Sequence, residues 1–294
     1  MQEATGDSGS SQADSWVAAK RYAGLFGALP SSFTTSIRIL MRDQVEFDAA
    51  MRPVTKYQVA RILKVGSFKG MLYYASKDLM GEYIKDKEFV SVGAMMDMFQ
   101  PIDIAAMIAC YVLYRKARKM LPDEDWEWIS QQLEPESQLG AQLGIALPEL
   151  GVAPGLLVTS LYHFGRCTFA LQNQKAYTDY RRQLKKEEKE FDLAHEQELW
   201  GCTAFQVGAM ILTNFRFGVD ISNSYTTGVN PERTFASLSN DWDKKMKMAR
   251  MWVDCLRKGL DQPIEKIPGK YFPMETARIH LDTKIVEINE GAQH

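Results

Sequence analysis

The spacing of the apolar residues constrains the fold of this chain more than any other feature, because it follows the period of an α-helix. Leu157, Leu161, Phe164, Thr168 and Leu171 recur at steps of four and three, which places them on one face of a helix. Strict alternation of apolar and polar residues, which marks a half-buried strand, is scarce. The sequence therefore predicts an all-α fold.

Proline and charge mark where the predicted helices begin and end. Pro101 interrupts a broad apolar face and suits the first turn of a new helix. Pro122 and the acidic run at 123–125 open the next one, so a boundary between two helical lobes is expected near 121–128. We expect a helix from about 155 to 172 after a loop at 151–155, and an exposed helix surface at 185–190. The predicted organisation is a disordered tail at 1–15, lobes at 16–120 and 121–259, and a linker with a last helix at 260–294.

Composition narrows the classes of function. The formal net charge is -2, which gives no overall basic surface for nucleic acid. The local basic run at 115–119 is interpreted as a solvated helix end, where cations favour the helix dipole. The N-terminus has neither the basic start nor the apolar run of a signal peptide, and no apolar stretch is long enough for a transmembrane helix. A cytoplasmic protein without membrane contact is expected.

The chain offers few residues for metal or nucleophilic chemistry. The motifs of phosphate loops, zincin metalloproteases and serine hydrolases are absent. Its 4 cysteines lie far apart and predict buried, reduced thiols (Cys110, Cys167, Cys202 and Cys255). His163 and Cys167, at i and i+4, share a helix face that could hold a metal. Their apolar surroundings favour a structural role in the core instead.

Five segments resemble, in order, those of the HDOD domain, a helical relative of the HD metal-dependent phosphohydrolases found mostly in bacterial signalling proteins. The resemblance spans roughly 29 to 225. Its segments are LPSSFTTSIRILM (29–41), VARILKVGSFKGMLYYAS (59–76), VSVGAMMDMFQPIDIAAMI (90–108), SLYHFGRCTFAL (160–171) and ELWGCTAFQVGAMIL (198–212). The resemblance implies a two-lobed helical domain.

The departures from the HD pattern fall on its metal ligands. Where an HD enzyme carries its His-Asp pair, this chain has Tyr162 and His163. A downstream histidine position is occupied by Ala204, and an upstream one falls near Glu136 or Ser137. HD catalysis needs a metal-bound hydroxide held by several His and Asp ligands at once. The sequence therefore predicts a degenerate site, with no catalytic residue, no metal and no cofactor.

The resulting hypothesis is a non-catalytic signalling or scaffold protein of HDOD type that acts by binding another signalling protein, with homo-oligomerisation left open. One alternative is a divergent phosphohydrolase whose metal site is rebuilt from His163, His195, Asp192 and nearby carboxylates. Another alternative is a sensor that binds a nucleotide or other small ligand between the lobes. For His163, we expect a neutral ring on the flank of the inward face, hydrogen-bonded to a neighbouring helix or carbonyl.

Overall fold

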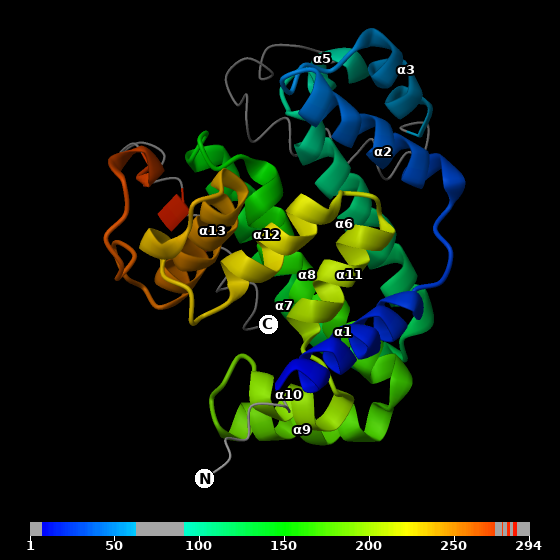
Figure 1. Cartoon of the computed structure of the whole chain (residues 1–294), viewed down its shortest axis with the longest axis vertical. Coiled ribbons are helices and arrows are strands. Elements are labelled where there is room, and N and C mark those ends of the chain that lie inside the picture. Colours follow the sequence, from blue (N-terminus) through cyan, green and yellow to red (C-terminus); the bar gives the residue numbers. More distant parts are fainter. Residues whose placement is uncertain (1–7, 63–90, 274–277, 279–280, 283–284, 287–294) are drawn as a thin grey trace.

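The structure is a computed structural model that describes residues 8–62 and 91–273, together with 278, 281–282 and 285–286 (Figure 1). Every regular element in these residues is a helix and none is a strand. The predicted all-α fold is therefore confirmed for the described part of the chain.

The α-helices follow the chain in this order: α1 (Ser8–Gly24), α2 (Ser31–Glu46), α3 (Pro53–Ile62), α5 (Val92–Met96), α6 (Pro101–Met120), α7 (Asp123–Ala146), α8 (Val152–Gln172), α9 (Gln174–Lys186), α10 (Leu193–Trp200), α11 (Ala204–Asn214), α12 (Val219–Val229) and α13 (Asp241–Arg257). Two short 3₁₀ turns, η1 (Phe235–Ser237) and η2 (Gly269–Tyr271), flank the last of these helices. As predicted, Pro101 and the acidic run at 123–125 begin α6 and α7.

Helix α8 is the centre of the fold. It is buried from Val152 to Ala170, and α7, α6, α11 and α13 pack around it (Figure 1). Two details differ from the sequence prediction. The helix begins at Val152 inside the expected loop, because Gly151, with φ 79°, makes the turn alone. His163 lies in the interior rather than on a flank, since α8 is apolar and enclosed on all sides.

Glycines allow the central helices to approach closely. A Cβ atom added to Gly140 would overlap the Gly155 carbonyl, and one added to Gly155 would overlap the Gly140 carbonyl, so α7 and α8 meet backbone to backbone. Gly165 of α8 makes the same kind of approach to the Ala204 carbonyl at the start of α11. The helix crossings that define the candidate site thus depend on side chains being absent at these positions.

A buried aspartate joins the starts of α6 and α8. Asp103 completes a capping box with Gln100, and its Oδ1 accepts a hydrogen bond from the Ala153 amide at 2.7 Å. Burial raises the pKa of Asp103 to about 6, despite the backbone amides that donate to it. The contact fixes the register of α8 relative to the N-terminal helices.

Helix α1, the first described helix, packs against the core. It packs on α11 and α8 and begins at Ser8, inside the stretch predicted as a tail; residues 1–7 lie outside the described residues. Ser15 is buried and accepts a hydrogen bond from Gln206 Nε2 at 2.9 Å. Buried residues of both predicted lobes belong to one continuous hydrophobic core.

The remaining predictions fall partly outside the described residues. Positions 63–76 of the second HDOD-like segment lie there, and so do most positions of the expected last helix, of which 278, 281–282, 285 and 286 are described and helical. The four cysteines are free thiols: Cys167, Cys202 and Cys255 are buried and Cys110 is half-buried. None of the described helices has the length and apolar content needed to cross a membrane.

Candidate functional site

The structure brings together two of the positions at which the chain departs from the HD pattern. His163 of α8 is 0% exposed, and its Nε2 lies 2.9 Å from Glu136 Oε2 on α7. A carboxylate accepts here, so Nε2 carries the proton that it donates. The expected hydrogen bond to a neighbouring helix is confirmed. The ring's Nδ1 is buried without a partner among the described residues, and neutrality of the ring stays a prediction.

Glu136 belongs to a chain of ion pairs that runs from α7 to α13. Arg257 Nη1 lies 3.0 Å from Glu136 Oε1 and 2.7 Å from Glu190 Oε1. Arg250 Nη2 then pairs with Glu190 at 3.1 Å and with Asp254 at 2.8 Å. Two arginines therefore alternate with three carboxylates. We call Glu136, His163, Glu190, Arg250, Asp254 and Arg257 the ionic cluster.

The charges of the ionic cluster decide the protonation state of Glu136. Burial on its own raises the pKa of this carboxyl. The contact with His163 and the charges of Arg257 and Arg250 outweigh burial and lower the pKa to about 2, from an ordinary value of 4.5. Glu136 is therefore an anion whose neutralisation is supplied by the protein's own side chains.

The other half of the Tyr162–His163 pair reaches a second buried carboxylate, Glu196 of α10. Tyr162 and Tyr180 donate their hydroxyls to Glu196 Oε1 at 3.0 and 2.8 Å. The Ala204 amide donates to Oε2 at 2.7 Å. All three donors are neutral groups. We call Glu196, Tyr162, Tyr180 and the Ala204 amide the tyrosine–carboxylate cluster.

Burial dominates the electrostatics of the tyrosine–carboxylate cluster. It raises the pKa of Glu196 above 4.5, against the lowering effect of its hydrogen bonds and of Arg166. At Ala204, where the HD pattern has a histidine, the backbone amide serves Glu196 and the carbonyl lies against Gly165. The backbone at that position joins α8, α10 and α11, and its methyl side chain contains no atom that could bind a metal.

Arg166, which follows Gly165 in the segment most like the HD motif, is enclosed by aromatic rings. Its guanidinium carbon lies 4.3 Å from the centre of the Trp128 ring and 5.4 Å from that of Tyr162. Its Nη1 donates to Gln132 Oε1 at 2.9 Å, while Nε and Nη2 have no hydrogen-bond partner among the described residues. Cation–π contact stabilises the charge in this position.

The residues proposed for a rebuilt metal site are engaged elsewhere. Asp192 caps α10 by accepting from the His195 amide at 3.0 Å, and it also accepts from Lys189 Nζ. The His195 ring instead faces Glu198, at 3.4 Å. Across the described ranges, no group of three His, Cys, Asp or Glu side chains has the arrangement of a metal site. His163, Asp192 and His195 are not brought together as ligands.

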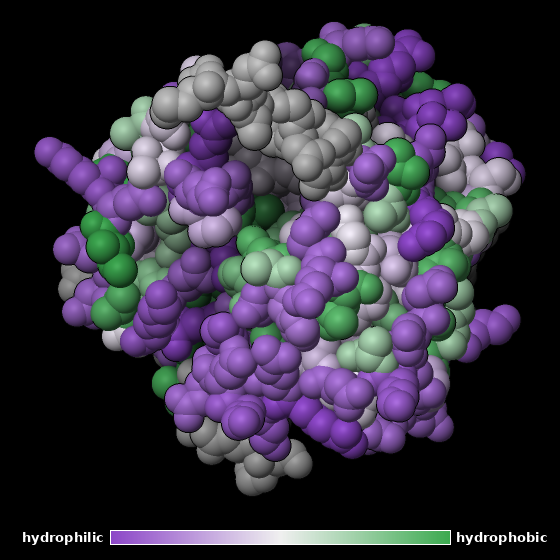
Figure 2. Space-filling view, turned by 60° about the horizontal axis from the view of Figure 1, so that its bottom comes forward, coloured by the Kyte–Doolittle hydropathy of each residue, from purple (hydrophilic) through white to green (hydrophobic). Residues whose placement is uncertain are grey.

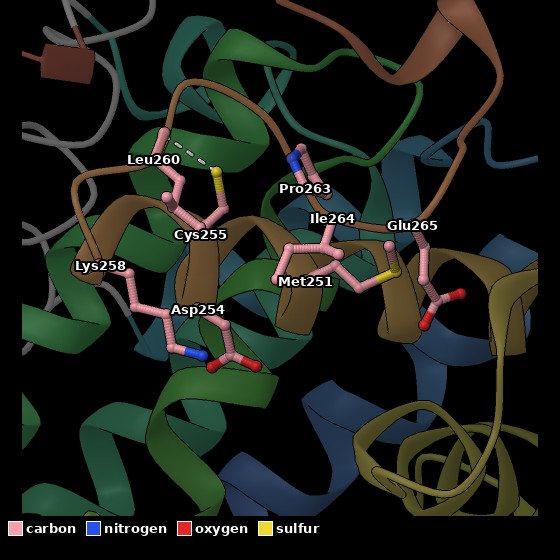
Figure 3. A pocket seen from close by; sticks show the side chains of 8 residues that line it. All are labelled: Met251, Asp254, Cys255, Lys258, Leu260, Pro263, Ile264 and Glu265. Atoms are coloured by element: carbon pink, nitrogen blue, oxygen red, sulfur yellow. Dashed lines mark hydrogen bonds between the residues drawn. The ribbon is translucent and has the colours of Figure 1, made fainter.

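A small pocket adjoins the ionic cluster through Asp254 (Figure 3). It lies between α13 and the loop that follows, and Figure 3 shows Pro263 and Ile264 of that loop opposite Met251. The Cys255 thiol donates to the Leu260 carbonyl at 3.1 Å, and burial raises the pKa of this thiol. The pocket volume, about 130 Å³, is below the range of about 300–1,000 Å³ that is usual for small-ligand sites.

A larger cleft, of about 520 Å³, lies on another side of the core. Its lining comes from α1, α10, α11 and the end of α12 with the following turn: Trp16, Leu193, Gln197, Thr203, Phe205, Gln206, Thr226, Val229, Asn230, Pro231 and Glu232. On the face drawn in Figure 2, hydrophilic residues cover most of the lower part, and hydrophobic residues form separate patches. With a volume of about 520 Å³ the cleft has the size of a small-ligand site, whereas the pocket at Asp254, at about 130 Å³, does not.

Sequence reasoning missed Glu196, Glu190 and Arg257. Glu196 had a local signal: it lies between Leu193 and Trp200 at steps of three and four, on the inward face of α10. The contact between Arg257 and Glu136 spans 121 positions, and nothing in either segment indicates it.

Comparisons with known proteins do not add to this picture. No family model, no curated protein and no solved structure matches the chain.

Proposed function

We propose that this chain is a non-catalytic, cytoplasmic signalling or scaffold protein of HDOD type, which acts by binding another protein. The proposal starts from the five ordered segments that resemble the HDOD domain. The resemblance puts His163, and an upstream position near Glu136 or Ser137, where HD enzymes hold metal, and the side chains of Glu136 and His163 are hydrogen-bonded in the structure.

The observation that carries the proposal is the bridge from Glu136 through Arg257 to Glu190. A metal-dependent hydrolase keeps carboxylates and imidazoles free to coordinate the metal and the water that it activates. Here the guanidinium group pairs with both carboxylates, and His163 donates the proton of its Nε2 nitrogen to Glu136 instead of offering that nitrogen to a metal. These side chains thus serve as structural ion pairs instead of metal ligands.

Phosphodiester turnover tests the non-catalytic part of the proposal. We expect no manganese-dependent hydrolysis of bis(p-nitrophenyl) phosphate by the wild type. We expect none either by Arg257→Gln, which frees Glu136 and Glu190 from their shared cation. Turnover that depends on His163 in either protein would favour the divergent phosphohydrolase instead.

Exposed apolar side chains around the turn from α2 to α3 indicate where a partner protein would bind. Val45, Val54 and Tyr57 are 78%, 57% and 67% exposed, and Phe47 lies between them in the chain. Exposed apolar side chains this close in the chain are candidates for a protein interface.

Affinity capture from the native host tests the binding part. We expect a partner that the wild type retains and the Val54→Glu/Tyr57→Glu double variant loses. A variant of equal folding stability that captures the same partner equally well would remove α2 and α3 from the interface.

A further inference from the structure

The cleft between α1, α10, α11 and the end of α12 has no role in the proposed function. It shares no lining residue with the ionic cluster or with the tyrosine–carboxylate cluster. We propose that it binds a small organic cation, an amine joined to an aromatic or other apolar body. The walls, the unused polar atoms and the charge of the cleft each point to this class of ligand.

The walls provide apolar and aromatic surface on two sides. Trp16 of α1 is half-buried, while Phe205 of α11 is buried at 4% exposure. Leu193, Val229 and Pro231 complete the apolar lining. An aromatic face attracts a cation within about 6 Å of the ring centre, and indole is the strongest of the natural rings. Trp16 can therefore contact either the body or the charge of an amine.

Three polar side chains of the cleft use donors within the protein. Gln206 Nε2 donates to Ser15, Gln197 Nε2 to the Gly201 carbonyl at 2.8 Å, and Thr226 to the Asn223 carbonyl at 2.8 Å. Gln197 Oε1 and the Glu232 carboxylate accept no hydrogen bond from the described residues. These acceptors, one of them a carboxylate, are free to accept hydrogen bonds from a ligand that donates.

The charge of the lining has the same preference. Glu232 is exposed, and no other charged side chain lines the cleft. Lys247 approaches from α13, but its ammonium donates to the Asn230 carbonyl at 3.2 Å. Phosphate and carboxylate ligands are held by arginine and lysine donors, which this lining lacks. An amine is therefore accepted where a nucleotide is rejected.

Tryptamine is a suitable probe because indole-3-propionate has the same ring with the opposite charge. In protein labelled with ¹⁵N at tryptophan, with the Trp16 signal assigned through Trp16→Phe, tryptamine should produce a saturable shift of the Trp16 indole signal in the millimolar range or below. Indole-3-propionate and adenosine monophosphate should bind at least about tenfold more weakly, since like charge and missing cations oppose them.

Substitution of Glu232 separates this site from general affinity for amines. Glu232→Gln should weaken tryptamine binding about fivefold, as expected for an exposed ion pair. Glu127→Gln removes an exposed carboxylate of α7 that does not line the cleft and should leave binding unchanged. Absence of a Trp16 shift, equal binding of the anion, or equal loss in both variants would overturn the proposal. None of these results depends on whether the chain hydrolyses phosphodiesters.

Discussion

Two adjacent residues of α8 lead to two buried carboxylates that are accommodated in opposite ways. Tyr162 reaches Glu196, which is 0% exposed and is surrounded by neutral donors. His163 reaches Glu136, whose side chain is 13% exposed and pairs with Arg257. The first carboxylate is held by hydrogen bonds in the interior, and the second by cations near the surface.

The difference shows two ways in which buried carboxylates on neighbouring helices can be accommodated by the protein's own groups. Carboxylates in a low-dielectric interior need either several donors or a countercharge. In an HD enzyme a metal would supply the countercharge. Here neutral hydroxyls and an amide donate hydrogen bonds to Glu196, and guanidinium groups supply the countercharge at Glu136. The opposite pKa changes of the two groups follow directly, because burial prevails at Glu196 and cations prevail at Glu136.

The largest effect is expected from Glu196→Ala. It leaves two tyrosine hydroxyls and the Ala204 amide without an acceptor in the interior, which costs about 3–5 kcal/mol of unfolding free energy. Urea denaturation followed by circular dichroism measures this loss. Glu198→Ala, on the exposed side of the same helix, is the matched control and should change stability by less than about 0.5 kcal/mol. Equal effects in the two variants would contradict the buried role of Glu196.

A smaller loss is expected from His163→Ala. The change removes one hydrogen bond and leaves a cavity beside Glu136, which still pairs with Arg257, so the cost is about 1–3 kcal/mol. The same denaturation experiment applies. His195→Ala, which breaks the longer contact to Glu198 and the ring contact with Tyr180, should cost less than about 1 kcal/mol. A His163→Ala protein as stable as the wild type would show that the ring is not part of the core.

The smallest effect is a difference in pH dependence between Glu136→Gln and Glu196→Gln. The pKa of Glu136 is lowered to about 2. Its contribution to the free energy of unfolding is therefore present above the ordinary pKa of 4.5 and is lost as pH falls through about 2. The raised pKa of Glu196 has the reverse effect. Its contribution to the free energy of unfolding is present below pH 4.5 and is lost as pH rises through its pKa in the folded protein.

The amount by which Glu136→Gln is less stable to unfolding than the wild type should therefore grow by about 1 kcal/mol between about pH 4 and pH 7. The deficit of Glu196→Gln should shrink over the same range. Urea denaturation of the three proteins at several pH values measures both slopes. Slopes of the same sign in the two variants would mean that the two carboxylates are not accommodated differently.

The sequence predicted the class of fold because the helical period of apolar residues is a local property. It also predicted the starts of α6 and α7, where Pro101 and the acidic run at 123–125 act within a single turn. It did not predict that α8 begins at Val152. Gly and Pro in GVAPG suggested a loop, whereas Pro154 fits the first turn of a helix, where its missing N–H has no partner to lose.

The candidate site was predictable only in part. The resemblance identified Glu136, Tyr162, His163 and Ala204, and the structure places them at the crossings of α7, α8 and α11. The cation that pairs with Glu136 was not predictable, because Arg257 comes from a distant segment that only tertiary packing brings there. The same holds for Glu190, which shares this cation. In the sequence, the segments around these two residues have the pattern of an ordinary charged surface. Buried charges here pair with residues far away in the chain, and a single sequence does not indicate such contacts.

The most direct test of the central claim is metal analysis of the wild type beside His163→Ala, both purified without chelator. If ionic and hydrogen-bonded pairing has replaced metal binding at the positions that resemble the HD motif, neither protein should contain a stoichiometric divalent metal. Added manganese should then produce no saturable heat in titration calorimetry. A stoichiometric metal in the wild type that disappears in His163→Ala would contradict this account and favour a rebuilt hydrolase.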